Sequence, residues 1–135
     1  MTDDSGGSGV LAGISIFVLE DDLDTMELVA GSLRKLGGVV RTATTAVAAL
    51  EALAAWRPDV ILCDLHLPDI DGYGFLARLR ANGADPMIPV IAISASHPVV
   101  ERERALEAGF ADYLVKPSRI AETAALITRI AKTRA

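Results

Sequence analysis

The sequence has few cysteines and few aromatic residues, and it has fewer basic than acidic residues. Its 135 residues include one cysteine, Cys63, so no disulfide can form within the chain, as is typical of proteins from a reducing compartment. Aromatic residues make up 4% of the chain and hydrophobic residues 51%, which predicts an aliphatic core. The net charge of −5 argues against a basic nucleic-acid-binding face, so we expect no direct nucleic-acid partner.

Long apolar runs and a secretory leader are also missing. No run approaches the roughly 20 residues that span a bilayer, and the first residues are rich in Gly, Ser and Asp instead of basic and then apolar. We therefore expect a cytoplasmic protein without a membrane partner. Residues 1–11 are expected to be a flexible segment and residues 12–135 to form one domain, which is long enough for one core.

Short apolar runs alternate with segments of helical periodicity from residue 13 onward. The helices are expected to end near Gly37, Pro58, Gly83 and Gly109, and a last helix follows Ser118. Thr44 or Thr45 can cap the second of them. The apolar runs predict five strands, at 14–19, 39–43, 60–63, 89–93 and 113–115.

This alternation predicts an α/β fold, a doubly wound parallel sheet of five strands with five helices. Crossovers between parallel strands are right-handed, so the helices are expected to cover both faces of the sheet. Ligands of such sheets bind at the carboxyl ends of the strands. The residues that follow each strand are therefore the candidate site.

Charged and polar residues stand at four of these strand ends. Residues 20–22 (Glu-Asp-Asp) follow the first strand, Asp64 the third, Ser94 the fourth and Lys116 the fifth. Carboxylates this close together need a cation, and Mg²⁺ suits oxygen ligands and also holds phosphate oxygens. A carboxylate nucleophile, a metal, a lysine and a hydroxyl together indicate a pocket that takes a phosphoryl group.

Each of these residues taken alone has a structural explanation. Asp21 or Asp22 could simply cap the first helix, because Asp is a common N-cap residue. Lys116 could be an ordinary solvated surface lysine, and Ser94 a turn hydroxyl. The functional interpretation depends on the four groups occurring together at four strand ends.

At this point the chain resembles the receiver domains of bacterial two-component response regulators. The resemblance extends from about residue 14 to residue 132, and the spacing of Asp64, Ser94 and Lys116 agrees with it. It implies a flavodoxin-like sheet with strand order 2-1-3-4-5. The motifs that carry it are residues 18–22 (VLEDD), 64–72 (DLHLPDIDG), 93–95 (ISA) and 108–117 (AGFADYLVKP).

The resemblance also implies residue roles. Asp64 matches the phosphoacceptor. Asp21 is expected to contact Mg²⁺ directly and Glu20 through water, and the backbone carbonyl of His66 is expected to be a further ligand. Lys116 matches the lysine that pairs with the phosphoryl group, and Ser94 matches the hydroxyl that follows this group inward. Tyr113 matches the aromatic residue that changes rotamer on activation. The peptide bond between Lys116 and Pro117 is often cis in this family.

Two positions are expected to influence the lifetime of the phosphorylated state, His66 and Ser96. His66 stands where the family more often has Met or Asn, and Ser96 is small. We hypothesise that the His66 imidazole changes the access of water to the phosphate. A solvent-facing loop histidine without such an effect is the alternative interpretation.

The expected function is that of a signalling phosphoacceptor and not of an enzyme with turnover, apart from self-phosphorylation by small donors and slow autodephosphorylation. The expected partners are a sensor histidine kinase or phosphotransfer protein and a downstream protein that binds the fourth helix, fifth strand and fifth helix. The alternatives are a haloacid-dehalogenase-like phosphatase, a flavin-mononucleotide binder and a pseudo-receiver that only binds a partner. We expect no output domain within these residues after the fifth helix, and both a stand-alone regulator and a piece of a larger protein remain open.

Overall fold

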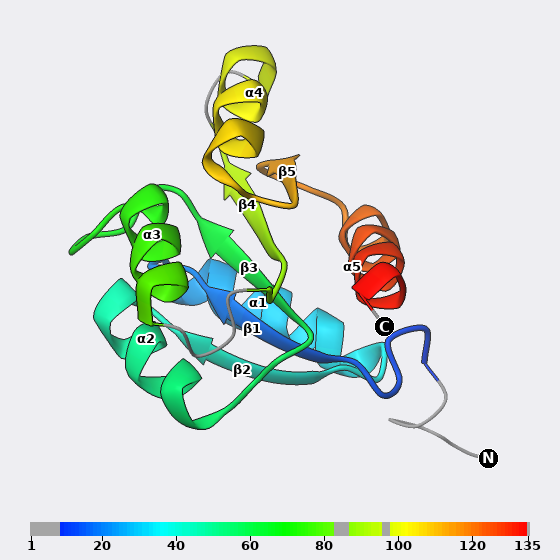
Figure 1. The fold of residues 1–135 in the computed structure, drawn as a ribbon. Helices are drawn as coiled ribbons and strands as arrows, with labels where there is room; N and C mark the ends of the chain where they lie inside the picture. The colour runs from blue at the N-terminus through cyan, green and yellow to red at the C-terminus, as the bar shows by residue number, and fades with distance from the viewer. Residues whose placement is uncertain (1–8, 83–86, 96–97, 135) are drawn as a thin grey trace.

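The computed structural model describes residues 9–82, 87–95 and 98–134, and within these ranges five strands alternate with five helices (Figure 1). The strands are β1 (Ser15–Leu19), β2 (Val39–Ala43), β3 (Val60–Asp64), β4 (Val90–Ser94) and β5 (Asp112–Val115). The helices are α1 (Leu23–Lys35), α2 (Ala46–Ala55), α3 (Gly72–Asn82), α4 (Pro98–Ala108) and α5 (Ile120–Arg134).

All strand pairs are parallel, and the strand order is β2-β1-β3-β4-β5. The predicted doubly wound sheet and its order are therefore confirmed. In the register, Asp64 at the end of β3 stands beside Ile93, and Ser94 at the end of β4 stands beside Val115. The strands thus end at similar heights, and their carboxyl ends form one edge of the molecule.

Two apolar layers cover the sheet, because neighbouring residues of a strand face opposite sides. Phe17 and Leu19 point toward α2, α3 and Ala105 of α4, whereas Ile16 and Val18 point toward α1 and α5. Figure 1 shows α1 and α5 on one side of the sheet and α2 and α3 on the other. The core is aliphatic, as the composition predicts, apart from a few rings such as those of Phe17 and Phe75.

Capping side chains and a glycine determine where the first two helices begin and end. Asp22 is the N-cap of α1 and accepts a hydrogen bond from the backbone N–H of Thr25 at 2.9 Å. Thr45, not Thr44, caps α2 through the N–H of Ala48 at 3.1 Å. Gly37, beyond the end of α1, has a φ of 101°, a left-handed conformation that glycine adopts without a steric penalty.

The segment predicted to be flexible, residues 1–11, lies largely outside the described residues and its assignment stays a prediction. Its last residue, Leu11, is buried against the α1–α5 side of the sheet and its N–H donates to the carbonyl of Leu36 at 2.9 Å. Within the described ranges, no helix combines the length and apolar character needed to cross a membrane.

Candidate functional site

The four strand ends converge as the sequence predicts. Oxygen atoms of Glu20, Asp21 and Asp64 all lie within 4.8 Å of one another, although the three residues come from the ends of β1 and β3. Glu20 and Asp64 are buried, with 5% and 4% of their surface exposed, whereas Asp21 is exposed. The cluster is therefore open to solvent on the Asp21 side and closed on the other.

Lys116 joins the two buried carboxylates. Its Nζ lies 2.7 Å from Oε1 of Glu20 and 3.0 Å from Oδ2 of Asp64. The lysine follows β5, and its backbone N–H donates to the carbonyl of Ser94 at 2.9 Å, which holds the ends of β4 and β5 together. The peptide bond between Lys116 and Pro117 is cis, as the resemblance implies.

The Asp64 carboxylate is held from two sides. Its Oδ1 accepts the backbone N–H of His66 at 2.9 Å, while its Oδ2 accepts Lys116. Glu20 is oriented in the same manner, because its Oε2 accepts the backbone N–H of Asp22 at 3.0 Å. Both carboxylates therefore keep one oxygen toward Lys116 and one toward backbone.

The donor set fits a hard divalent cation. Three carboxylates gather here, and Lys116 offsets one of their three negative charges, which leaves an excess that a divalent ion would neutralise. Magnesium commonly binds through one or two carboxylates and keeps several waters, and the exposed Asp21 leaves room for them. Thiol and imidazole groups, which would favour zinc, are not part of this described cluster.

Burial and neighbouring charges shift the pKa values of Glu20 and Lys116. Burial raises the pKa of Glu20, and the nearby Asp64 charge adds to this, although the hydrogen bonds from Lys116 and Asp22 act in the opposite direction. For Lys116, burial alone would lower the pKa, but the hydrogen bonds and charges of Glu20 and Asp64 outweigh it, so the pKa is raised. Lys116 therefore stays cationic through the neutral pH range.

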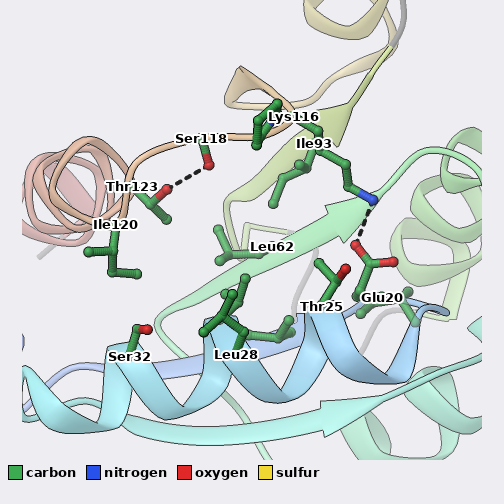
Figure 2. Close-up of a pocket in the computed structure, with 14 residues that line it drawn as sticks. Glu20, Thr25, Leu28, Ser32, Leu62, Ile93, Lys116, Ser118, Ile120 and Thr123 are labelled. Atoms are coloured by element: carbon green, nitrogen blue, oxygen red, sulfur yellow. Dashed lines mark hydrogen bonds and ion pairs between the residues drawn. The ribbon is translucent and has the colours of Figure 1, made fainter.

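A cavity of about 470 Å³ adjoins the cluster between α1 and the start of α5. Figure 2 shows the Lys116–Glu20 pair at one end, with Leu28, Leu62 and Ile120 lining the interior. Among the described lining residues, only Glu20 and Lys116 carry charge. The cavity is thus apolar, and the charged chemistry lies at its edge, where Asp64 and Asp21 stand.

The predicted switch residues lie close to this edge in the sheet. Ser94 is fully buried at the end of β4, and the Tyr113 ring is buried in the apolar layer under α2, α3 and α4. The His66 side chain is exposed on the loop after β3. Ser96, the second residue expected to influence phosphate lifetime, lies outside the described residues.

Two residues whose side chains join separate elements of the fold were not identified from the sequence. In the sequence Asp69 is only one residue of the motif at 64–72, yet its carboxylate accepts hydrogen bonds from the backbone N–H groups of Ala46 and Val47 in the first turn of α2. Tyr73 of α3 binds α4 through Glu101 and Arg104. The available signal for Asp69 was the absence of any acidic residue in the first turn of α2; no local pattern indicated the Tyr73 contacts.

Comparison with known proteins agrees with this geometry. Residues 16–128 match the family model for the response regulator receiver domain. The transcriptional regulatory protein PrrA of Mycobacterium tuberculosis is 37% identical over 119 residues, which cover 88% of this chain and 50% of PrrA. The chain thus spans about half the length of the curated relatives of this kind that it matches.

Solved structures show the same architecture. The receiver domain of the Francisella response regulator 1452 has a TM-score of 0.84 at 26% identity and covers 91% of this chain and 100% of its own. The receiver domain of the sensor histidine kinase PA1611 from Pseudomonas aeruginosa PAO1 has a TM-score of 0.81 at 33% identity. The match covers 90% of this chain and 99% of the PA1611 chain. That structure is described as having a magnesium ion coordinated in the active site cleft.

Proposed function

Because the chain belongs to the response regulator receiver domain family, we propose that it is a switch in which Asp64 accepts a phosphoryl group. The observation that carries the proposal is the bridge from Lys116 to Glu20 and Asp64 within a cluster of three carboxylates. Such a cluster is the arrangement that a phosphoryl acceptor needs: a held nucleophile, a fixed cation and a site for a divalent ion.

Asp21, Glu20, Asp64 and the backbone carbonyl of His66 are the groups that would hold the metal. Magnesium, when bound, would neutralise charge that develops on the transferred oxygens. Asp21 is the exposed member, which suits direct contact with an ion arriving from solvent. Both carboxylate oxygens of Glu20 already have partners, Lys116 and the backbone N–H of Asp22, which suits a contact with the metal through water.

Transfer follows from the way Asp64 is held. One carboxylate oxygen attacks the phosphorus in line, forming the O–P bond while the P–N bond to a donor phosphohistidine breaks and the imidazole leaves. Lys116 moves its contact from the Asp64 carboxylate to a phosphoryl oxygen. Ser94 donates a hydrogen bond to another of these oxygens, so that Lys116 and Ser94 together bind the new charge.

The switch would then reach the surface through Ser94 and Tyr113. Drawing Ser94 toward the phosphoryl group makes room for the Tyr113 ring, which lies one strand away. The adjoining α4 contributes only Ala105 to the core among its described side chains, so few apolar contacts fix its position. Phosphorylation acts by favouring one of two arrangements that already exchange.

The proposed partners are a sensor histidine kinase or phosphotransfer protein as donor and a downstream protein that binds α4, β5 and α5. Asp112 of β5 links the two helices of this surface, because its carboxylate forms ion pairs with Arg102 of α4 at 2.8 Å and with Arg129 of α5 at 3.0 Å. We place the protein in the cytoplasm, where its buried, unpaired Cys63 thiol would persist. We expect no turnover of phosphomonoesters, which a haloacid-dehalogenase-like phosphatase would show.

The test is labelling of the wild type and Asp64→Asn by acetyl phosphate in the presence of Mg²⁺. We expect the wild type to gain one phosphoryl group, seen as a mass increase of the intact protein, and Asp64→Asn to gain none. Asp24→Asn is the matched control, because Asp24 is an exposed acid of α1 outside the cluster. Equal labelling of Asp64→Asn and wild type would reject Asp64 as the acceptor.

Addition of chelator should abolish wild-type labelling. Labelling that persists without a divalent cation would contradict the role of the acidic cluster, even if Asp64 remained the acceptor. Release of inorganic phosphate from a phosphomonoester at a steady rate would instead favour the phosphatase alternative.

A further inference from the structure

The β3–α3 loop is attached to the N-terminus of α2 by one side chain. The Oδ1 of Asp69 accepts the backbone N–H of Ala46 at 3.0 Å, and its Oδ2 accepts that of Val47 at 3.0 Å. The partners are 23 and 22 residues away in sequence, so the contact joins two elements that the chain itself does not connect. The carboxylate therefore acts as a two-point tether.

Helix α2 needs this carboxylate because its own sequence leaves its first turn incomplete. The first N–H groups of a helix have no partner inside the helix, and they carry partial positive charge. Thr45 satisfies the N–H of Ala48, but the first turn of α2 contains no acidic residue. Asp69 supplies both the missing acceptors and the negative charge from another part of the chain.

The tether holds a loop whose two ends are already fixed. At the β3 end, the N–H of Leu65 donates to Ile93 at 3.0 Å. At the α3 end, the N–H of Gly72 donates to Leu65 at 2.9 Å, and a Cβ at Gly72 would lie 2.8 Å from the Cα of Leu65. This close approach makes the loop a tight arch with its ends together. Asp69 fixes the exposed outer part of that arch.

His66 lies on the same arch, three residues before Asp69. Its N–H donates to Oδ1 of Asp64, and its side chain is exposed on the arch. The orientation of its carbonyl therefore depends on how the rest of the arch is held. A group that restrains a metal ligand from outside the first coordination sphere commonly changes metal affinity on removal.

We propose that Asp69 is a positioning residue for the divalent cation: by docking the β3–α3 loop on α2, it holds the His66 carbonyl toward the acidic cluster. This inference rests on the proposed function, since it assumes that the cluster of Glu20, Asp21 and Asp64 binds the metal. It adds a residue that touches neither the metal nor the phosphoryl group, and it makes α2 part of the support for the site.

The test compares Asp69→Ala with Thr45→Ala. Both substitutions remove a hydrogen-bonded cap from the same end of α2, but the Thr45 bond lies within the helix and does not reach the loop. Magnesium alone is titrated into each ¹⁵N-labelled protein, and the dissociation constant is read from backbone amide shifts. Thermal unfolding of each variant measures the loss of stability independently.

We expect Asp69→Ala to raise the magnesium dissociation constant by about tenfold, the lower end of the effect of removing a group that supports a metal ligand. Thr45→Ala should lower the melting temperature by about 4 °C, as loss of a helix cap does in a domain of this size. Its magnesium dissociation constant should stay within about twofold of the wild-type value, which corresponds to a difference in binding free energy of about half a kcal/mol or less. Asp69→Asn keeps one acceptor oxygen and should give an intermediate dissociation constant.

Labelling by acetyl phosphate supplies a second readout. Asp69→Ala should need more magnesium for half-maximal labelling but reach the wild-type rate at saturating magnesium, because Asp64 and Lys116 are unchanged. A lowered maximal rate with unchanged magnesium dependence would overturn the inference. So would equal weakening of magnesium binding in Asp69→Ala and Thr45→Ala, or no weakening in either; Asp69→Asn provides the same comparison if Asp69→Ala unfolds.

The two proposals fail in different ways. Labelling of Asp64→Asn at the wild-type level defeats the proposed function. A magnesium dissociation constant for Asp69→Ala that equals the Thr45→Ala value defeats the positioning role, even when Asp64 is shown to be the acceptor.

Discussion

The hydroxyl of Tyr73 in α3 donates a hydrogen bond to the carboxylate of Glu101 in α4. The same ring lies under the guanidinium of Arg104, 4.5 Å from its carbon, and packs edge-on against Phe110 with 5.6 Å between ring centroids. Burial and the bond to Glu101 raise the pKa of Tyr73, so the hydroxyl remains a donor at neutral pH. One side chain of α3 thus contacts α4 and the turn that follows it.

Removal of this hydroxyl should loosen α4. We expect Tyr73→Phe to lower the free energy of unfolding by about 1 kcal/mol, the usual net value of one hydrogen bond, and to speed amide hydrogen exchange in α4. Glu103→Gln is the control, because it removes a charge from an exposed position of the same helix. Unchanged exchange in α4 would mean that Arg104 and Phe110 hold the helix without the hydroxyl.

Replacement of Lys116 should separate metal binding from switching. Lys116→Ala removes the cation that occupies Glu20 and Asp64, so we expect Mg²⁺ to bind at least as tightly as in wild type. With beryllofluoride and Mg²⁺ added, amide exchange in α4 should change in wild type and stay unchanged in Lys116→Ala. Lys132→Ala, at an exposed position of α5, should behave as wild type; a normal response of Lys116→Ala would remove the lysine from the switch.

The stability that Asp69 supplies should depend on pH. Hydrogen bonds from the N–H groups of Val47 and Ala46 lower the pKa of Asp69 in the folded protein, even though slight burial acts in the opposite direction. The native state therefore binds this proton less readily than the unfolded chain, for which the pKa is about 3.9. The stabilisation is complete above that value and is lost as the pH falls through the lower folded value.

Asp69→Asn removes the titrating group. We therefore expect the difference in melting temperature between wild type and Asp69→Asn to be greatest near neutral pH and to shrink as the solution is acidified below about pH 4. A difference that stays constant down to pH 2 would show that the charge of Asp69 does not contribute.

His66 offers a test of phosphate lifetime. Its exposed imidazole stands two residues after Asp64, where it can cover one approach of water to the phosphoryl group. We expect His66→Ala to shorten the half-life of the phosphorylated protein several-fold, measured by loss of the added mass after removal of the donor. Equal half-lives would leave His66 as a solvent-facing loop residue.

The fold was predictable because its signals are local. Most strands are short apolar runs, and four of the five helices are followed by a stop signal, such as Gly37 or Gly109, although the periodicity of the fourth helix is weak. The parallel arrangement then brings Asp64 and Lys116 to one edge whatever the details of packing. Thr45 instead of Thr44 as the cap of α2 was open from sequence, since the two neighbours have the same capping chemistry.

The sequence by itself thus determined the order of the elements and the groups of the acidic cluster, because strand ends and their residues are set by short-range patterns. Only the tertiary structure decided which loop docks on which helix. The Asp69 carboxylate reaches Ala46, and the Tyr73 hydroxyl reaches Glu101. Such contacts depend on the spacing and tilt of packed helices, which follow from the whole core and leave no periodic signal in the chain.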